Sequence, residues 1–340
     1  MKNLTIDYWN HHVDRYGFMK KIFDKEPVDN IIIFACNEWD TLSIFGNVYV
    51  WDYFHYYVQK EKIKIELITA SPIPYQSENL NITYWGEYWL IKTYANVMRP
   101  DASKAIKLKK EKAMGLKYHF ICMNHRPHIH RCRLIDLLEK NNLISSNAIS
   151  WHNTNEFGTY PFEYFKPKML KFNQTFDSYA EDKNTSNLPI EYFQSFAQLI
   201  SESTDEHMFF SEKVSMALIW EKPFLAHSGP GLHKYLTTLG FELYTEIFDY
   251  SFDSELDSKK RLNMIVNNFI KLCEIPLDKL KKIENQLQPK LEHNKNRAKE
   301  IAMNIDKFPE IIKSFKDDFS ALTDIYENIN YINYIQNLTK

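Results

Sequence analysis

The run Ile31-Ile32-Ile33-Phe34-Ala35-Cys36 decides the fold class of this chain. An unbroken apolar run of this length is typical of a strand that is buried on both faces, as in a parallel sheet covered by helices. The polar residues 37–41 follow it, and residues 42–59 then have the character of a long helix rich in aromatic side chains. This order of strand, turn and helix predicts an α/β fold with a parallel sheet.

The same order recurs along the chain, and a different pattern begins near residue 258. From there an apolar stripe at helical spacing, and then a long charged segment, indicate helices. We therefore expect two Rossmann-like α/β domains, 1–115 and 116–255, followed by a helical C-terminal extension, 256–340. Within the two domains the patterns predict strands at residues 63–70, 80–85, 118–124, 197–202, 223–227 and 241–244, and helices at 87–97, 131–140, 212–219 and 232–239.

The composition is that of an ordinary folded protein, with 44% hydrophobic and 25% charged residues among 340. The net charge of −2 gives no general attraction to nucleic acid. One basic stretch, residues 104–117, is interpreted as a solvated helix face or loop, with DNA contact as the alternative. Two of the four cysteines, Cys36 and Cys122, lie in apolar strand-like runs, which indicates buried thiols and no disulfide framework. Without an apolar signal region or a span of membrane length, we expect a cytoplasmic protein.

Polar residues follow several of the predicted strands, at residues 37–40, 124–131, 201–204 and 227–231. In open parallel sheets, ligands bind beyond the carboxyl ends of the strands. We therefore expect these segments to lie near a common site. The chain has no Gly-rich phosphate loop, dinucleotide fingerprint or Gly-any-Ser-any-Gly motif, which argues against ATPase, dehydrogenase and hydrolase functions.

The stretch Ser211-Glu212-Lys213 is a candidate donor site for a nucleotide. The Glu212 carboxylate can accept from ribose hydroxyls, and the Lys213 ammonium can neutralise phosphate. Ser211 has the residue type of an N-cap, so the pair would stand in the first turn of a helix. A glycine-containing turn, Gly229-Pro230-Gly231, precedes the next predicted helix, whose free N–H groups could cradle an anion. The alternative is an exposed charge pair at a helix start.

Residues 124–131 also open a predicted helix directly after a strand. Asn124, Arg126 and Arg131 are candidate donor-binding residues there, because a guanidinium matches phosphate oxygens. The alternative is a solvated basic turn.

Metal sites are disfavoured by the sequence. The soft ligands His125, His128, His130 and Cys132 do not follow a structural zinc spacing, and no second ligand pair follows them. Asp249 and Asp253 are candidates for a loop cap or a substrate contact. No Asp-any-Asp triplet follows a predicted strand, so we expect positive side chains, and no metal, to balance a diphosphate.

At these residues the chain resembles a known group of enzymes. The segments 210–225, 236–241 and 249–253 resemble uncharacterised viral and bacterial glycosyltransferase-like proteins, and Ser211-Glu212-Lys213 is similar to the Thr-Glu-Lys motif of α1,3-fucosyltransferases. The segment 120–138 and Leu291-Glu292-His293-Asn294 fit the same group. The resemblance covers the C-terminal part of the chain and is weak in the N-terminal domain.

The resemblance implies a metal-independent glycosyltransferase with two Rossmann-like domains, the GT-B arrangement. Domain 116–255 would then bind the nucleotide-diphosphate sugar, and domain 1–115 would face the acceptor. Glu212 would bind ribose, Lys213 phosphate, and Arg126 or Arg131 the diphosphate, with Asn124, Ser211, Gly229 and Gly231 completing the donor site. No cofactor is expected besides the donor.

A carboxylate of the N-terminal domain would deprotonate the acceptor hydroxyl. Glu38 and Asp40 are the candidates, with Glu87 behind them, although each has a turn or capping role as its alternative. The acceptor could be a glycan, a protein or modified DNA, and host cytoplasm is the expected location if the protein is viral. Two other functions stay open: a DNA-modifying glycosyltransferase that uses residues 104–117, and a non-catalytic α/β binding or structural protein.

Overall fold

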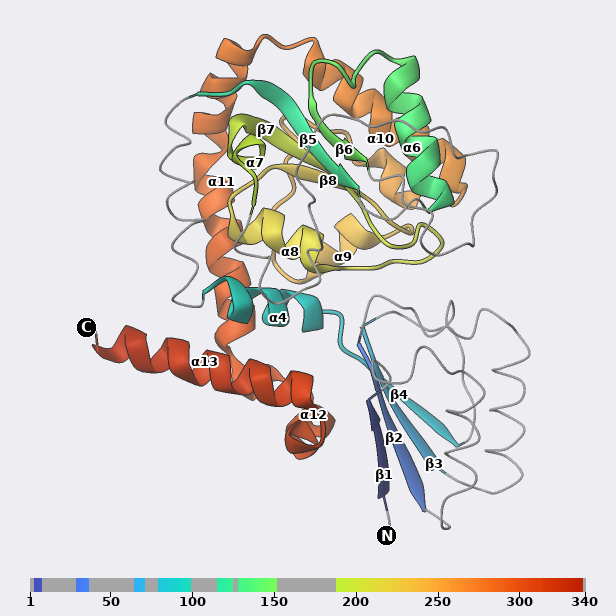
Figure 1. Ribbon diagram of the computed structural model, residues 1–340, viewed down its shortest axis with the longest axis vertical. Coiled ribbons are helices and arrows are strands. Elements are labelled where there is room, and N and C mark those ends of the chain that lie inside the picture. Colours follow the sequence, from blue (N-terminus) through green and yellow to red (C-terminus); the bar gives the residue numbers. More distant parts are fainter. Residues whose placement is uncertain are drawn as a thin grey trace. The chain divides into compact units, whose positions relative to one another are not determined.

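In the computed structural model the chain forms two compact units (Figure 1). The first comprises Met1–Trp89 together with Asn304–Lys340, and the second comprises Leu90–Met303. The structure describes residues 3–7, 29–36, 64–70, 79–98, 115–124, 128–151 and 188–338. The polypeptide therefore leaves the first unit, builds the second and returns to the first.

The first unit contains a parallel sheet of order β1-β2-β3-β4. Its strands are β1 (Asn3–Asp7), β2 (Asn30–Ala35), β3 (Lys64–Thr69) and β4 (Leu80–Tyr84). The isoleucines of β2 are buried on both faces of this sheet, as the apolar run predicts. The strand order follows the chain order, so every crossover among these strands runs in the same direction.

The C-terminal segment contributes to the core of the first unit. It consists of η6 (Ile305–Lys307), α12 (Glu310–Ser314), η7 (Lys316–Asp318) and α13 (Ser320–Leu338). The Phe319 ring stacks on Phe34 of β2 with centroids 5.1 Å apart, and the Phe308 ring lies 5.3 Å from Trp85. α4 (Tyr88–Val97) begins in this unit and continues into the second.

The second unit contains a parallel sheet of order β6-β5-β7-β8. Its strands are β5 (Tyr118–Asn124), β6 (Ala148–Trp151), β7 (Ser195–Ser201) and β8 (Phe224–His227). The chain passes from β5 to β6 on one side and later places β7 on the other side of β5. The order therefore reverses between β5 and β7, which makes their carboxyl ends the topological switch point of this sheet.

Helices cover both faces of the second sheet (Figure 1). α10 (Ser258–Cys273) contacts β5, β8 and α6 (Ile129–Lys140) on one side. α8 (Glu212–Ile219) and α11 (Leu277–Met303) contact each other and β7 on the other side. The shorter elements are α7 (Ile190–Gln194), α9 (Leu232–Thr238) and η5 (Ser251–Ser254). None of the described helices has the length and apolarity needed to cross a membrane.

The structure confirms the predicted α/β class with parallel strands, and it differs from the predictions in particular elements. Residues 241–244 form no strand, so that prediction is wrong. The backbone of Glu242 bonds to the side chain of Asn294 and not to a neighbouring strand. Asn294 Oδ1 accepts from Glu242 N at 2.8 Å, and Asn294 Nδ2 donates to Glu242 O at 2.9 Å. β1, β6 and α7 were not predicted. The predicted extension 256–340 is divided between the two units at residue 303, and the predicted helix 42–59 lies outside the described residues.

Candidate functional site

The first turn of α6 lies against the carboxyl end of β7. His130 Nε2 is 2.8 Å from the carbonyl oxygen of Glu202. Arg131 Nη2 donates to the carbonyl oxygens of Ser201 at 3.2 Å and Glu202 at 3.1 Å. Both side chains are buried. Arg131 was predicted to follow the strand 118–124, and the structure shows that part of its guanidinium also fastens α6 to the end of β7.

The start of α8 meets the same strand end. Ser211 is the N-cap of α8, and its Oγ accepts from Lys213 N at 3.2 Å, as its residue type predicts. Ser211 N donates to Glu202 Oε1 at 3.2 Å, and Ser211 Oγ donates to Glu202 Oε2 at 2.5 Å. The N-termini of α6 and α8, which are the positive ends of their helix dipoles, therefore both lie beside Glu202 at the switch point.

Lys213 is held between two carboxylates. Its Nζ lies 2.8 Å from Glu212 Oε1 and 3.7 Å from Glu202 Oε2. The Lys213 side chain is 10% exposed and those of both glutamates are at most 2% exposed, so the three charges interact with little solvent screening. The predicted Glu212-Lys213 pair is therefore a buried ion pair, not an exposed one.

Burial raises the pKa of Glu202, while the Lys213 ammonium and the hydrogen bonds from Ser211 act in the opposite direction. Glu202 was not among the predicted site residues. It is the last residue of the predicted strand 197–202 and lies in the segment 201–204 that was expected near the site, so its position in the sequence was the available signal.

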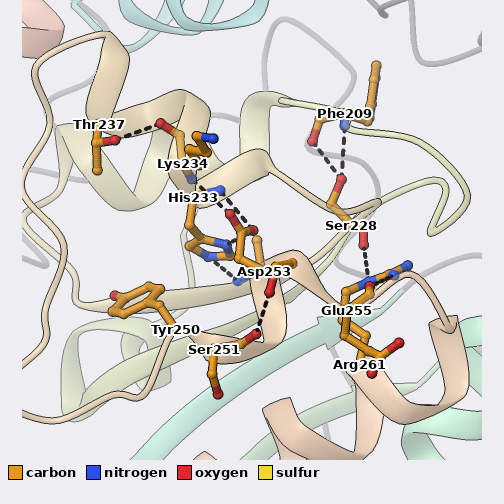
Figure 2. Close-up of polar contacts among 12 residues, drawn as sticks. Phe209, Ser228, His233, Lys234, Thr237, Tyr250, Ser251, Asp253, Glu255 and Arg261 are labelled. Atoms are coloured by element: carbon orange, nitrogen blue, oxygen red, sulfur yellow. Dashed lines mark hydrogen bonds and ion pairs between the residues drawn. The ribbon is translucent and has the colours of Figure 1, made fainter.

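The start of α9 is occupied by a side chain of the protein itself (Figure 2). Asp253 Oδ1 accepts from His233 N at 3.0 Å, and Asp253 Oδ2 accepts from Lys234 N at 2.8 Å. His233 Nδ1 lies 2.9 Å from Asp253 Oδ1, and its Nε2 accepts from Ala226 N at 3.2 Å. The N–H groups that were predicted to bind phosphate therefore donate to Asp253, which acts as a helix cap.

Both glycines of the turn before α9 have backbone roles. A Cβ on Gly229 would lie 2.0 Å from the carbonyl carbon of His207, so only glycine fits this close approach. Gly231 has φ of 90°, in the left-handed region, and its N–H donates to Asp253 O at 2.8 Å. The structure thus places both residues as supports of the turn after β8.

Arg261 of α10 is a second structural support near this turn. Its Nε donates to Ser228 O at 3.0 Å and its Nη1 donates to Glu255 O at 2.6 Å (Figure 2). Its Nη2 donates to the carbonyl oxygen of Asp205. These bonds join α10 to the loops that follow β7 and β8.

Asp205, His130 and His227 form a cluster beside Arg131 that was not predicted from the sequence. Asp205 Oδ1 is 3.5 Å from His130 Nδ1, and Asp205 Oδ2 is 3.9 Å from His227 Nε2. Burial, with the nearby Arg131 acting in the same direction, lowers the pKa of His130 to about 4. Burial also lowers the pKa of His227 to about 3, with His130 acting in the same direction. Both imidazoles are therefore neutral at pH 7.

The remaining predicted residues lie at the end of β5, in the first unit or outside the described residues. Asn124 ends β5, and its Nδ2 donates to Cys122 Sγ at 3.2 Å and to Ser150 O at 3.5 Å. Glu87 lies in the turn before α4, in the first unit. The candidates Glu38, Asp40, Arg126 and His125, and residues 104–114 of the basic run, lie outside the described residues.

In the described parts of the chain, no group of three or more His, Cys, Asp or Glu side chains has a metal-binding arrangement. His128 and His130 stack with ring centroids 5.6 Å apart, and His130 Nε2 is engaged with Glu202 O. No protein-family model, curated protein or solved structure matches the chain.

Proposed function

We propose that the chain is a metal-independent glycosyltransferase of the GT-B type, which moves a sugar from a nucleotide-diphosphate sugar to an acceptor hydroxyl. One observation carries the proposal: the Glu212-Lys213 pair and Arg131 meet at the carboxyl end of β7, the switch point of a parallel sheet. This is the position at which open α/β sheets bind nucleotides. The two α/β units would be the two domains of such an enzyme.

Each charged group has a role in this proposal. Glu212 accepts from the ribose hydroxyls of the donor, and Lys213 neutralises the diphosphate. The ammonium stabilises the charge that develops on the leaving nucleoside diphosphate, in a site with little water to screen it. Because Lys213 is paired with Glu212, donor binding would exchange that pair for contacts to ribose and phosphate. Arg131 supports the site by holding α6 at β7. Glu38 or Asp40 remains the proposed acceptor base.

Nucleotide binding tests this function directly. UDP, GDP, ADP and TDP are each added to the protein, and thermal melting is followed. A ligand at about 100 times its dissociation constant stabilises the folded state by about 2.7 kcal/mol, so the matching nucleotide raises the melting temperature by several degrees. A panel in which no nucleotide shifts the melting temperature contradicts the proposal and favours a non-catalytic α/β protein.

The Lys213→Ala variant tests the assigned phosphate contact by calorimetric titration with the nucleotide that binds. Loss of a buried charge contact weakens affinity by about tenfold or more. Lys213→Arg retains the positive charge and should recover part of the affinity. The matched control is Lys295→Ala, because Lys295 pairs with Glu221 in the same unit but is 43% exposed. Equal affinities for Lys213→Ala and Lys295→Ala would remove Lys213 from the donor site.

A further inference from the structure

At the carboxyl end of the second sheet, the strands β5, β7 and β8 carry three polar residues side by side. Ser201 of β7 is the register partner of His227 of β8. Ile121 of β5 is the register partner of Gln198, and the same register continued to the strand ends sets Asn124 level with Ser201. Neighbouring strands lie about 4.8 Å apart, and register partners project from the same face. We call Asn124, Ser201 and His227 the polar rung.

The polar rung projects toward α6 and α10. Side chains two residues apart in a strand share a face, so Asn124 lies on the side of Cys122 and Phe120. The Phe120 ring packs 4.8 Å from Phe269 of α10. The His227 ring is 5.7 Å from the His130 ring of α6. The rung is therefore enclosed between the sheet and the helices that border the switch point.

Each member of the polar rung has a buried polar atom that is not hydrogen-bonded within the described residues. These atoms are Asn124 Oδ1, Ser201 Oγ, and both Nδ1 and Nε2 of His227. The three residues are 3%, 1% and 0% exposed. Buried polar atoms in folded proteins are almost always hydrogen-bonded, so a row of such atoms on adjacent strands indicates a bound group with its own donors and acceptors.

The chemistry of the rung selects an uncharged group. The amide oxygen of Asn124 only accepts hydrogen bonds, and the Ser201 hydroxyl both donates and accepts. In a neutral imidazole one nitrogen donates and the other accepts. Charges of both signs lie beside the rung, because Asp205 Oδ2 is 3.9 Å from His227 Nε2 and the Arg131 guanidinium donates to Ser201 O, so neither an anion nor a cation is favoured. A hydroxyl carries one donor and two acceptor positions, so neighbouring hydroxyls of one ligand can satisfy an amide, a hydroxyl and an imidazole together.

We propose that Asn124, Ser201 and His227 form a buried subsite that binds neighbouring hydroxyl groups of a ligand at the switch point. The identity of that ligand as the sugar nucleotide rests on the proposed function. The hydroxyls come either from the ribose or from the transferred sugar. Donor specificity then depends on these neutral side chains as well as on Lys213 and Glu212.

The Ser201→Ala variant tests the subsite, because it removes only the Oγ atom. Its matched control is Ser195→Ala, a buried serine at the amino end of the same strand whose Oγ donates to Glu191 O at 2.7 Å. Affinities are measured by calorimetry for the nucleoside diphosphate that binds, its 2′,3′-dideoxy analogue and its sugar conjugate. We expect Ser201→Ala to weaken binding at least tenfold for a hydroxyl-bearing ligand, while its melting temperature without ligand stays equal to or above that of the wild type.

The ligand arms identify the source of the hydroxyls. A loss of affinity for the nucleoside diphosphate, but not for its dideoxy analogue, assigns the subsite to ribose. A loss confined to the sugar conjugate assigns it to the transferred sugar. If Ser201→Ala binds all three ligands like Ser195→Ala and the wild type, or if a crystal structure of the nucleotide complex shows only water at Ser201 Oγ, the subsite proposal is overturned.

A separate arm distinguishes failure of the subsite from failure of the proposed function. If no nucleotide binds the wild-type protein, the glycosyltransferase proposal fails, and free ribose, fucose, glucose and galactose are titrated instead. Binding of one of these sugars that is lost in Ser201→Ala, but kept in Ser195→Ala, supports the subsite without the glycosyltransferase. The absence of any such binding overturns the subsite as well.

Discussion

At the scale of single residues, Glu202 joins the two helices that begin at the switch point. Its carbonyl oxygen accepts from Arg131 of α6, and its carboxylate accepts from the N–H and Oγ of Ser211 at the start of α8. The same carboxylate lies 3.7 Å from Lys213 Nζ. Because Glu202 is fully buried, water cannot replace any of these contacts.

The Glu202→Gln variant removes this charge with little change in shape. An NH₂ group replaces one carboxylate oxygen and cannot accept a hydrogen bond, so the buried donors of Ser211 and Lys213 lose one of the two acceptor atoms. We expect a loss of about 1–3 kcal/mol in the free energy of unfolding, measured by urea denaturation. Glu246→Gln is the control, because the Glu246 pair with Lys290 is 50% exposed on the carboxylate side and is worth at most about 1 kcal/mol. Equal losses in the two variants would contradict the role of Glu202.

The buried histidines predict a dependence of stability on pH. Burial lowers the pKa of His130 to about 4 and that of His227 to about 3, whereas an unfolded histidine titrates near 6.5. Between these values the unfolded chain binds protons that the native protein does not. Stability is therefore complete above about pH 6.5, and it falls as the pH drops toward 4, by up to about 1.4 kcal/mol per pH unit for each histidine.

Urea denaturation at pH 7.5, 6.5, 5.5 and 4.5 measures this slope. The His130→Gln variant lacks one of the two titrating groups, so its stability should fall less steeply over the same range. Asp205 does not produce the effect, because its pKa is lowered from 3.8 and lies below the range. Parallel slopes for the variant and the wild type would show that His130 titrates normally in the native state.

At the scale of elements, the turn between β8 and α9 depends on its glycines for different reasons. Gly229 lies against the backbone of residue 207, whereas Gly231 requires a left-handed φ of 90° but has no atom within 4 Å of its Cβ position. Substitution at Gly231 therefore adds backbone strain alone, and substitution at Gly229 forces the two backbone segments apart.

We expect Gly229→Ala to lower the melting temperature far more than Gly231→Ala. Strain at a left-handed position costs about 1–2 kcal/mol, and overpacking against a backbone costs about 3 kcal/mol or more. Gly115→Ala is a matched control, because Gly115 also has a left-handed φ of 89° and open space at its Cβ position. Gly115→Ala and Gly231→Ala should thus behave alike. A Gly229→Ala variant as stable as these two would refute the close approach to His207.

At the scale of the whole molecule, the C-terminal segment belongs to the first unit although it is distant in sequence. Phe319 is buried and stacks on Phe34 of the central strand β2, and Phe308 packs against Trp85. The first sheet thus depends on residues that are synthesised after the second unit is complete.

The Phe319→Ala variant should destabilise the first unit and leave the second intact. Truncation of a buried phenylalanine costs about 3–5 kcal/mol. Hydrogen exchange measured by mass spectrometry should show faster exchange in β2 and β3, with unchanged protection in β5 and β7. Tyr334→Ala is the control, because Tyr334 of α13 is 60% exposed, and this variant should change hydrogen exchange in neither unit. Faster exchange in β5 and β7 of Phe319→Ala would mean that the units do not unfold separately.

The sequence by itself determined the α/β class, the positions of most strands and the start of α8. These features have local causes: a strand buried on both faces needs an unbroken apolar run, as at Ile31–Ile33, and an N-cap serine bonds to the backbone two residues on. The charged candidates Glu212, Lys213 and Arg131 were also visible, because they follow predicted strands. β6 escaped prediction because its sequence Ala-Ile-Ser-Trp contains no continuous apolar run, unlike the equally short β8.

Only the tertiary structure decided which polar groups have partners. The Asp253 carboxylate accepts from backbone N–H groups at the start of α9, and the Asn294 side chain bonds to the backbone of Glu242, where a strand was predicted. Both contacts join segments that are far apart in the chain. The register of β7 and β8 sets Ser201 beside His227 and so creates the polar rung. No local pattern encodes these pairings, because hydrogen bonds and charge pairs depend on where distant segments meet once the core has packed.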